Sequence, residues 1–204
     1  MIILVGTHIF LYNMLIVQHR VNTVAQLYAT PTQYGVELDV RDKYTELVLQ
    51  HDALAPGEPW KMYLQAYNHA LLIANVKAEG IEQHIINDLA TVHCTNYFLL
   101  DVSLPQLVKL SNQGISNLAV RYSEYEPIEL ATQFIGKVQW VWVDWFSTMP
   151  LQLEQYAYLK QHYKLCLVSP ELQGHSTEFI HSTKQLLHNM PIDAVCTKHP
   201  QLWL

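Results

Sequence analysis

The chain has 204 residues, of which 50% are hydrophobic and 15% are charged, and its formal net charge is −6. This length can bury a substantial hydrophobic core and fits a single domain. The negative charge argues against a general nucleic-acid-binding protein, but it allows a small anionic substrate because a local site can be positive in a negative protein.

Residues 1–17 form a strongly apolar run. The run lacks the basic segment and the small-residue cleavage site of a signal peptide. His19 and Arg20 end it before the roughly 20 apolar residues that a membrane span needs, so we expect no integral membrane span. Met14 is expected to begin the first strand, with residues 1–13 as an N-terminal apolar extension or an extra strand.

Short apolar runs alternate with amphipathic segments through the rest of the chain. The strands are predicted at 14–18, 35–40, 71–76, 97–102, 117–121, 139–145, 164–168 and 193–197. The helices are predicted at 23–29, with Thr23 as a candidate N-cap, and at 79–91, 105–112, 127–134, 152–162 and 176–189. Alternating strands and helices predict a parallel sheet, and eight such units predict a single (β/α)8 TIM barrel.

Residues 41–60 interrupt the alternation. They read as a small hairpin insertion after the second strand, which holds His51 and is closed by Pro56 and Gly57. We find no linker, change of composition or internal repeat, so residues 14–204 are expected to form one TIM-barrel domain.

The three cysteines, Cys94, Cys166 and Cys196, are widely spaced and form no C-x-x-C motif. This spacing argues against a zinc site. It predicts free thiols in a reducing compartment, and therefore a cytoplasmic protein.

Three short pieces of sequence carry chemistry: His19-Arg20, Glu37-Leu38-Asp39 and His51-Asp52. Each lies at or just beyond the carboxyl end of an apolar, strand-like run. Parallel barrels build their active sites at these strand ends. Two imidazoles and two carboxylates in this position predict an acid/base and metal site.

The order of these pieces resembles the glycerophosphodiester phosphodiesterase family. That family has HR and NT motifs, then E-x-D, then HD, then a strand ending in Lys, here Lys77. The closing stretch 193–200 resembles the family's last strand, in which apolar residues precede Thr-Asp-x-Pro. The resemblance covers about residues 14–204. It implies a phospholipase-C-like barrel that hydrolyses phosphodiesters with two histidines and a divalent cation.

The chain departs from the family at several positions. Val21 and Asn75 stand where the family has glutamates that bind the metal, and Lys198 replaces the usual Asp. The loop between HR and NT is also shorter than in the family. The two-histidine part of the motif is thus intact, whereas part of the metal cage is missing.

His19 and His51 are the candidate catalytic residues. Phosphodiester cleavage needs one group to deprotonate the attacking hydroxyl and another to protonate the leaving oxygen, and imidazole can do either near neutral pH. The alternative is that His19 is a buried histidine bonded to a nearby carbonyl. Asp52 either orients His51 or caps the following turn.

Glu37 and Asp39 are expected on the same side of their strand, because side chains alternate with a period of two. Two such carboxylates repel unless a cation or a proton lies between them. Mg²⁺ or Ca²⁺ suits the oxygen ligands, and Asn75 is expected to add a neutral oxygen. The alternative is a structural network with nearby cations. Further charge is available at later strand ends, from Asp101, Asp144 and Glu171.

Substrate binding is predicted at four further strand-end residues: Arg20, Lys77, Arg121 and Glu171. The cations suit phosphate oxygens, and Arg can bind them in a bidentate manner. Trp142 is predicted to face the same way as Asp144, where it lies either in the barrel core or against a ligand.

The sequence therefore predicts a glycerophosphodiester phosphodiesterase-type hydrolase that acts on a small-molecule phosphodiester. The alternatives are a sugar-phosphate aldolase or isomerase, with Lys77 as a Schiff-base or proton-transfer residue, and a non-catalytic protein that binds a phosphorylated sugar or headgroup. No nucleic-acid partner is expected, and the oligomeric state stays open.

Overall fold

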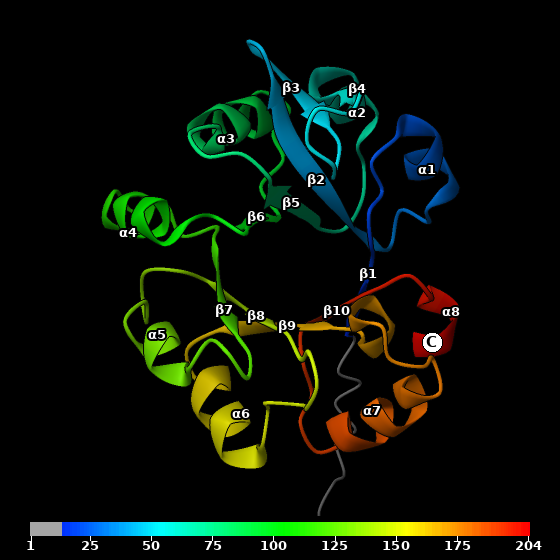
Figure 1. The fold of residues 1–204 in the computed structure, drawn as a ribbon, viewed down its shortest axis with the longest axis vertical. Helices are drawn as coiled ribbons and strands as arrows, with labels where there is room; N and C mark the ends of the chain where they lie inside the picture. Colours follow the sequence, from blue (N-terminus) through cyan, green and yellow to red (C-terminus); the bar gives the residue numbers. More distant parts are fainter. Residues whose placement is uncertain (1–13) are drawn as a thin grey trace, which may run out of the picture.

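The computed structural model describes residues 14–204, so the predicted extension at 1–13 lies outside the described residues. Within this range, strands form one curled sheet with helices around its outside (Figure 1). The parallel strands are β1 (Leu15–Gln18), β2 (Gly35–Lys43), β5 (Leu72–Val76), β6 (Tyr97–Leu100), β7 (Ala119–Tyr122), β8 (Trp140–Val143), β9 (Lys164–Val168) and β10 (Ala194–Thr197). All eight predicted strands are present close to their predicted bounds.

The strand order runs from β2 through β1, β10, β9 and β8 to β7. On its other side β2 pairs with β5, which pairs with β6. The two ends of this path, β6 and β7, meet at one isolated bridge between Leu99 and Leu118. The fold is thus mixed α/β, with a curled sheet of parallel strands whose thinnest seam lies between β6 and β7.

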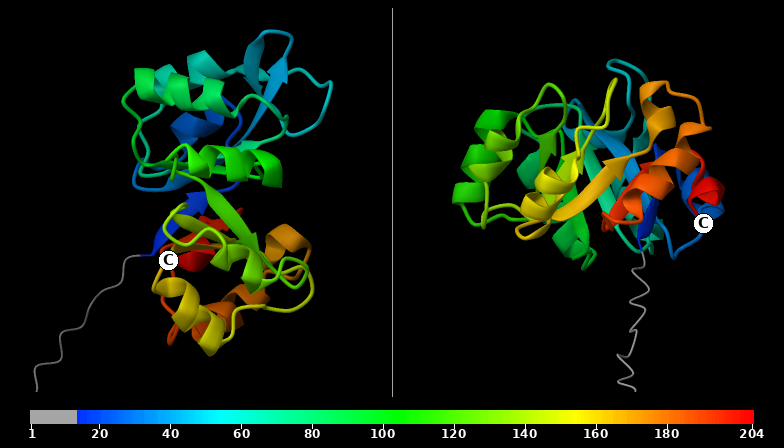
Figure 2. Two further views of the ribbon diagram at one scale, coloured as in Figure 1. Left: turned by 90° about the vertical axis from the view of Figure 1, so that its left-hand side faces the viewer. Right: turned by 90° about the horizontal axis from the view of Figure 1, so that it is seen from below.

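The α-helices pack on the outer face of the sheet, as Figures 1 and 2 show, whereas the short 3-10 helix η1 packs through Leu172 against the side chains inside the curl. Their bounds are α1 (Val24–Ala29), α2 (Trp60–Ala66), α3 (Glu82–Thr91), α4 (Leu104–Asn112), α5 (Ile128–Thr132), α6 (Leu153–Lys160), η1 (Pro170–Gln173), α7 (Phe179–Leu187) and α8 (Pro200–Trp203). The predicted cap at Thr23 is confirmed. Gln26 N donates to Thr23 Oγ1 at 3.1 Å and Thr23 N donates to Gln26 Oε1 at 3.1 Å, which forms a capping box.

The stretch after β2 contains two short strands and a helix, whereas the sequence predicted only a hairpin. β3 (Glu46–Leu49) pairs antiparallel with the end of β2, and β4 (Glu58–Pro59) pairs with β3. Helix α2 then leads to β5. It was not predicted, although its buried residues Trp60, Tyr63 and Leu64 follow the i, i+3, i+4 spacing of an amphipathic helix.

Two apolar layers hold the sheet in place. One lies inside the curl and includes Val17, Phe98 and Trp142, whereas the larger one lies between sheet and helices and includes Val141 and Val143. This alternation along β8 agrees with the predicted orientation of Trp142. Because the period is two, the inner rows continue past the apolar layer into polar residues at the carboxyl ends of the strands. Those residues are His19, Glu37, Asp39, Asn75, Lys77, Arg121, Asp144 and Lys198.

Two further findings bear on the sequence-based expectations. No helix among residues 14–204 has the length and apolar character needed to cross a membrane. All three cysteines are free. Burial raises the pKa of the Cys166 and Cys196 thiols well above the ordinary value, so both behave as core residues.

Candidate active site

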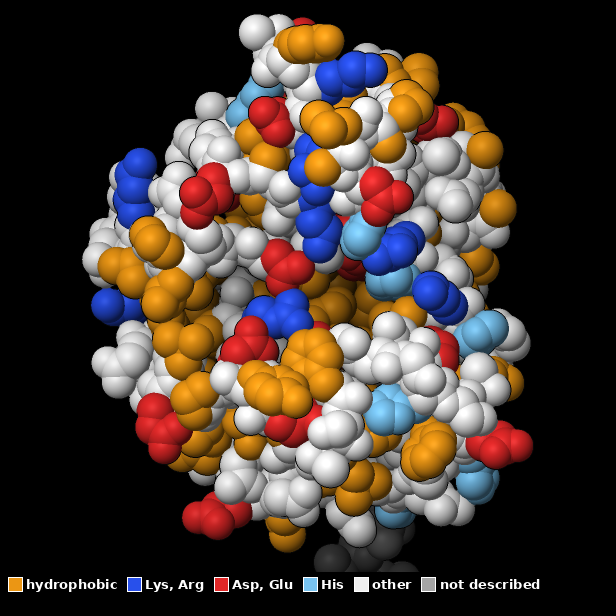
Figure 3. Space-filling model, viewed as in Figure 1, with side chains coloured by type: hydrophobic (Ala, Val, Ile, Leu, Met, Phe, Trp, Pro, Cys, Tyr) orange, Lys and Arg blue, Asp and Glu red, His pale blue; other side chains and the backbone are white. Residues whose placement is uncertain are grey.

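A polar cavity of about 250 Å³ opens at the carboxyl ends of the parallel strands. Figure 3 shows a hollow near the middle of this face, with charged and His side chains around it and hydrophobic side chains deep inside. We call this cavity the mouth. Its polar lining comprises His19, Arg20, Asn75, Asp101, Arg121, Asp144, Gln173 and Lys198.

Glu37 is buried on β2 behind the mouth. Its Oε2 accepts a hydrogen bond from the backbone N–H of Arg20 at 2.9 Å, and its Oε1 accepts one from Asn75 Nδ2 at 3.0 Å. Burial and then the nearby charge of Asp39 raise the pKa of Glu37 to about 7. The site therefore favours a proton or a positive charge at this carboxylate near neutral pH.

Asp39 is buried as completely as Glu37. The Asn22 side chain binds it twice: Asn22 Nδ2 donates to Asp39 Oδ2 at 2.8 Å, and Asp39 N donates to Asn22 Oδ1 at 2.8 Å. Arg20 Nε lies 3.9 Å from Oδ2, and Lys77 Nζ lies 3.6 Å from Oδ1. The structure thus brings two of the predicted phosphate-binding cations to the predicted carboxylate pair.

His19 is a largely buried residue at the end of β1, with 16% of its side chain exposed. Burial lowers its pKa to about 3, and nearby positive charges contribute. These charges belong to Arg20, Lys198, Lys77 and His51. His19 Nε2 lies 3.7 Å from Glu37 Oε2, and Nδ1 is buried with no hydrogen-bond partner among the described residues. Burial therefore favours the neutral form of the imidazole.

His51 follows β3 and is half-exposed. Its Nδ1 lies 2.8 Å from Asp52 Oδ1, and its carbonyl accepts a hydrogen bond from Arg41 Nη2 at 3.0 Å. The bond to His51 lowers the pKa of Asp52. Within residues 14–204, His51 is not among the side chains that line the mouth. Asp52 holds the ring through Nδ1, so Nε2 is the nitrogen available for proton transfer.

Two site residues have strained backbones. Arg20 and Asp101 have φ angles of 54° and 57°, in the left-handed region that favours glycine. At Arg20, the N–H donates to Glu37, and at Asp101 the carboxylate accepts a hydrogen bond from Lys77 Nζ at 3.2 Å. Strain of this kind concentrates at functional sites.

Arg121 is surrounded by carboxylates in the second half of the mouth. Its guanidinium lies 2.6 Å from Asp101, 2.9 Å from Glu126 and 2.5 Å from Asp144. Gln173 Nε2 also donates to Asp144, at 2.7 Å. Arg121 lines the mouth as predicted, but its donors already have protein partners. Its role as a phosphate ligand stays a prediction.

Glu171 joins the end of β9 to the end of β10. Its Oε1 accepts hydrogen bonds from Thr197 Oγ1 at 2.6 Å and from the backbone N–H of Lys198 at 3.0 Å. Its Oε2 accepts one from Ser169 Oγ, which accepts one from Trp203 Nε1 at 2.9 Å. These bonds position Lys198, whose side chain lines the mouth. Direct contact of Glu171 with a substrate stays a prediction.

Sequence reasoning did not single out Asn22 as a site residue, and it named Gln173 as one of several residues that follow the strand at 164–168 without giving it a role. Asn22 belongs to the NT motif, and that motif could have indicated a role in the site. Its contact with Asp39 joins residues 17 positions apart, so no local pattern predicts the contact. Gln173 ends the short 3-10 helix η1 after β9, where sequence gives little indication of side-chain orientation. Val21 is 2% exposed and packs in the outer apolar layer.

The donor set for a cation is small. Within residues 14–204, no group of three or more His, Cys, Asp or Glu side chains is placed to hold a metal ion. Asp39 Oδ1 and Asn75 Oδ1, however, are buried and accept no hydrogen bond among these residues. Two such oxygens beside Glu37 suit a hard cation, while Lys77 already places positive charge near Asp39. A divalent ion held by these residues stays a prediction.

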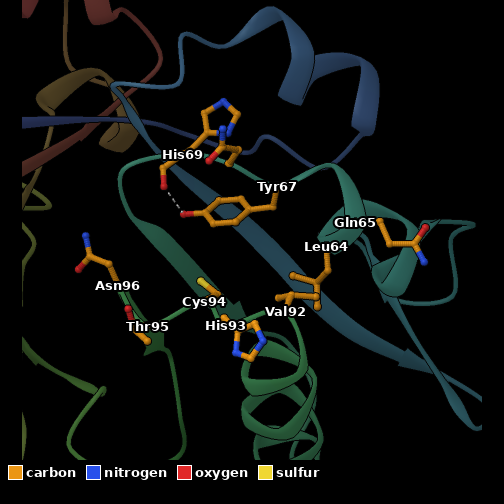
Figure 4. Close-up of a pocket in the computed structure, with 10 residues that line it drawn as sticks. Leu64, Gln65, Tyr67, His69, Val92, His93, Cys94, Thr95 and Asn96 are labelled. Atoms are coloured by element: carbon orange, nitrogen blue, oxygen red, sulfur yellow. Dashed lines mark hydrogen bonds between the residues drawn. The ribbon is translucent and has the colours of Figure 1, made fainter.

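A second cavity, of about 410 Å³, lies at the opposite ends of β5 and β6. Figure 4 shows its lining, in which the Tyr67 hydroxyl donates to the His69 carbonyl. The lining includes Gln65, His93 and Cys94 but no Lys, Arg, Asp or Glu. Burial raises the pKa of Cys94 to about 11. The uncharged lining and the unreactive thiol leave the mouth as the better phosphate site.

No protein-family model and no curated protein matches the chain. Among solved structures, a glycerophosphodiester phosphodiesterase from Agrobacterium tumefaciens strain C58 aligns with a TM-score of 0.67 at 13% identity, over 94% of this chain and 99% of that one. A glycerophosphoryl diester phosphodiesterase from Parabacteroides distasonis gives 0.62 at 12% identity, over 93% and 84%.

A mutant tryptophan synthase α-subunit from Pyrococcus furiosus gives a TM-score of 0.51 at 11% identity, over 92% of this chain and 89% of that one. At these identities the likeness shows the fold, which resembles that of the glycerophosphodiester phosphodiesterase barrels. The fold alone does not select the chemistry, because one barrel fold hosts many reactions.

Proposed function

We propose that this protein is a phosphodiester hydrolase of the glycerophosphodiester phosphodiesterase type, built as a complete (β/α)8 barrel with the hairpin as an insertion. The observation that carries the proposal is the group formed by His19, Glu37 and Asp39 at one mouth. Buried atoms of His19 and Asp39 have no hydrogen-bond partner among the described residues. Buried polar atoms are nearly always paired, so a ligand that supplies the missing partners is the simplest explanation.

The two histidines divide the proton transfers. His19 acts as the base toward the attacking hydroxyl. Burial keeps its imidazole neutral, and a bound phosphate anion would raise its pKa toward the range in which a general base is effective. His51, oriented by Asp52, protonates the leaving oxygen. This step requires His51 to approach the substrate from the edge of the mouth.

Positive side chains hold the phosphate. Arg20, Lys77 and Lys198 provide charge around the mouth, and preorganised cations stabilise the charge that develops on phosphate oxygens. Glu37, Asp39 and Asn75 are the residues that would hold Mg²⁺ or Ca²⁺. A cation bound there would withdraw charge from a phosphate oxygen.

The aldolase alternative receives less support from the geometry. A Schiff-base lysine must act as a neutral amine, whereas Lys77 Nζ lies 3.2 Å from Asp101 and 3.6 Å from Asp39. Two ion pairs thus already engage the Lys77 side chain. The binding-protein alternative keeps its support from Val21 and Asn75, and the assay below separates it from the hydrolase.

The test is hydrolysis of a panel of glycerophosphodiesters and bis-p-nitrophenyl phosphate, with Mg²⁺ and Ca²⁺ varied. His19→Ala and His51→Ala are each expected to lower turnover by at least about 10²-fold, the scale of a general acid or base. His181→Ala is the matched control, because His181 is exposed on α7 away from the mouth. Circular dichroism checks that each variant folds.

Wild-type turnover in both site variants would show the two-histidine mechanism to be wrong. If the wild type hydrolyses nothing on the panel but binds glycerophosphodiesters in calorimetry, the protein is a binder and the substitutions at Val21 and Asn75 have removed the chemistry.

A further inference from the structure

Two apolar side chains project into solvent from the stretch that follows β2, whose parallel part ends at the mouth. Tyr44 and Leu54 have exposed fractions of 93% and 104%, and their φ angles are 59° and 65°. Such turn positions are usually occupied by Gly, Asn or Asp, because a Cβ is strained there. Neither burial nor backbone preference explains a Tyr and a Leu. Strain retained at exposed positions indicates a function other than folding.

These side chains belong to a braced unit, residues 41–57, which we call the hairpin lobe. Arg41 Nη2 donates to the His51 carbonyl at 3.0 Å, and Gln50 Nε2 donates to the Pro56 carbonyl at 2.7 Å. A hollow of about 220 Å³ lies within the lobe and is lined by Tyr44, Val48, Leu54, Ala55 and the charged stretch 41–43. The lobe thus presents apolar surface next to charge.

A second apolar projection follows β7 and β8. The rings of Tyr125 and Phe146, which we call the aromatic pair, have centroids 5.6 Å apart and are 76% and 38% exposed. Glu124 braces the pair by accepting hydrogen bonds from the backbone N–H groups of Phe146, Ser147 and Thr148. Since β8 lies four places from β2 in the sheet order, the pair and the lobe follow strands on opposite sides of the mouth.

The positive charge of this face lies between the two projections. Arg20 and Lys198 are exposed and line the mouth. The lobe itself adds no net positive charge, because its acidic residues outnumber its basic ones. They are Asp42, Glu46 and Asp52, against Arg41 and Lys43. An anionic surface placed across the face would therefore contact cations at the centre and apolar side chains at the edges.

We infer that this face docks on the surface of an anionic phospholipid bilayer. Tyr44, Leu54 and the aromatic pair enter the interfacial layer, where aromatic rings and exposed apolar side chains partition favourably. Arg20 and Lys198 face the lipid phosphates, which attract cations near the surface.

The distribution of apolar side chains distinguishes a bilayer from a protein partner. A protein interface is apolar at its centre and polar at its rim. Here the centre is the polar mouth and the apolar side chains stand around it. A membrane surface can take up separate apolar side chains without a complementary pocket for each of them. If the proposed function holds, the phosphodiesters that reach the mouth are then those of lipid headgroups.

The test is sedimentation of the full chain with vesicles of phosphatidylcholine and with vesicles of equal parts phosphatidylcholine and phosphatidylglycerol. The wild type is expected to bind the mixed vesicles more tightly. The double variant Tyr44→Asn/Leu54→Asn is expected to weaken this binding by at least about tenfold, because two apolar side chains no longer leave water. Its Tm should equal or exceed that of wild type, because Asn adopts the left-handed conformation more easily.

The matched control is Tyr28→Asn/Leu204→Asn, which removes a Tyr and a Leu of similar exposure from α1 and the end of the chain. Unchanged vesicle binding in the control supports the inference. Absence of wild-type binding to either vesicle, equal loss in both double variants, or self-association that disappears in the Tyr44→Asn/Leu54→Asn variant overturns it. Sedimentation requires no turnover, so the hydrolysis panel fails or succeeds independently.

Discussion

The two halves of the sheet hold their polar side chains in different ways. On β1, β2 and β5, buried atoms of His19, Asp39 and Asn75 have no hydrogen-bond partner among the described residues. On β7 and β8, Arg121 and Asp144 bind each other and further neighbours. Since unpaired buried polar atoms are costly, the first half retains positions for ligand atoms. The Arg121 and Asp144 side chains already have protein partners and support the first half.

Two glutamates show the same contrast in their pKa values. Burial and the charge of Asp39 raise the pKa of Glu37 in the first half to about 7. At Glu124 in the second half, burial raises the pKa, but backbone N–H groups from Thr148, Ser147 and Phe146 outweigh it and lower the value to about 2. The ionised Glu37 carboxylate therefore lowers the stability of the folded state, whereas the ionised Glu124 carboxylate raises it.

The largest effect is expected from Asp39→Asn. Turnover on the phosphodiester panel should fall by about 10²-fold or more, because the mouth loses half of its carboxylate pair. The Tm should hold or rise, since repulsion from Glu37 is relieved. Kinetics and thermal unfolding measure the two responses. The Asp144→Asn control is expected to lower both turnover and Tm. If Asp39→Asn also lowers both, Asp39 has a structural role like that of Asp144.

Arg121→Leu is expected to lower stability more than turnover, the reverse of Asp39→Asn. Three carboxylates lose their common partner, so the free energy of unfolding should fall by about 3 kcal/mol. Arg121→Lys keeps the charge and should lose less. Urea unfolding gives the stabilities, and KM separates the roles. A raised KM at unchanged stability would instead make Arg121 the phosphate ligand that the sequence predicts.

The two glutamates predict opposite pH responses. The folded-state pKa of Glu37 lies above its unfolded value, so ionisation penalises the folded state. Relative to Glu37→Gln, wild type should lose stability as pH rises from about 4.5 to about 7, by up to about 3 kcal/mol. The folded-state pKa of Glu124 is lowered, so wild type's advantage over Glu124→Gln should shrink as pH falls from about 4.5 to about 2. Urea unfolding across pH tests both signs.

The smallest effect is expected from Ser169→Ala. This change removes the hydroxyl that links Trp203 to Glu171, and it should cost about 1 kcal/mol. Turnover should stay near the wild-type value, because the serine contacts other protein groups. Ser182→Ala, on the exposed side of α7, serves as the control. A changed KM in Ser169→Ala would bring Glu171 into substrate binding, as the sequence suggested.

The sequence predicts the inner and outer faces of the strands well, because alternation is a local property. Trp142 and Asp144 follow it, and so do Glu37 and Asp39. Helix α2 was missed because the hairpin reading ran up to Trp60, where the helix begins. The hydrogen-bond partners of the site side chains could not be predicted from the sequence. Whether Arg121 meets a phosphate or carboxylates depends on side chains from three other segments, and no local pattern records that.

The seam between β6 and β7 has a consequence for hydrogen exchange. β6 and β7 share only the Leu99–Leu118 bridge among the described residues. Across the curled sheet, β1 and β2 form a second short joint with two paired positions, Val17 with Gly35 and Gln18 with Val36. Few backbone hydrogen bonds therefore join one set of strands to the other. Segments separated by such joints open at a lower free energy than global unfolding. Amides along the seam are expected to exchange before those of β8 and β9, and a ligand that spans the mouth should slow them without touching either strand.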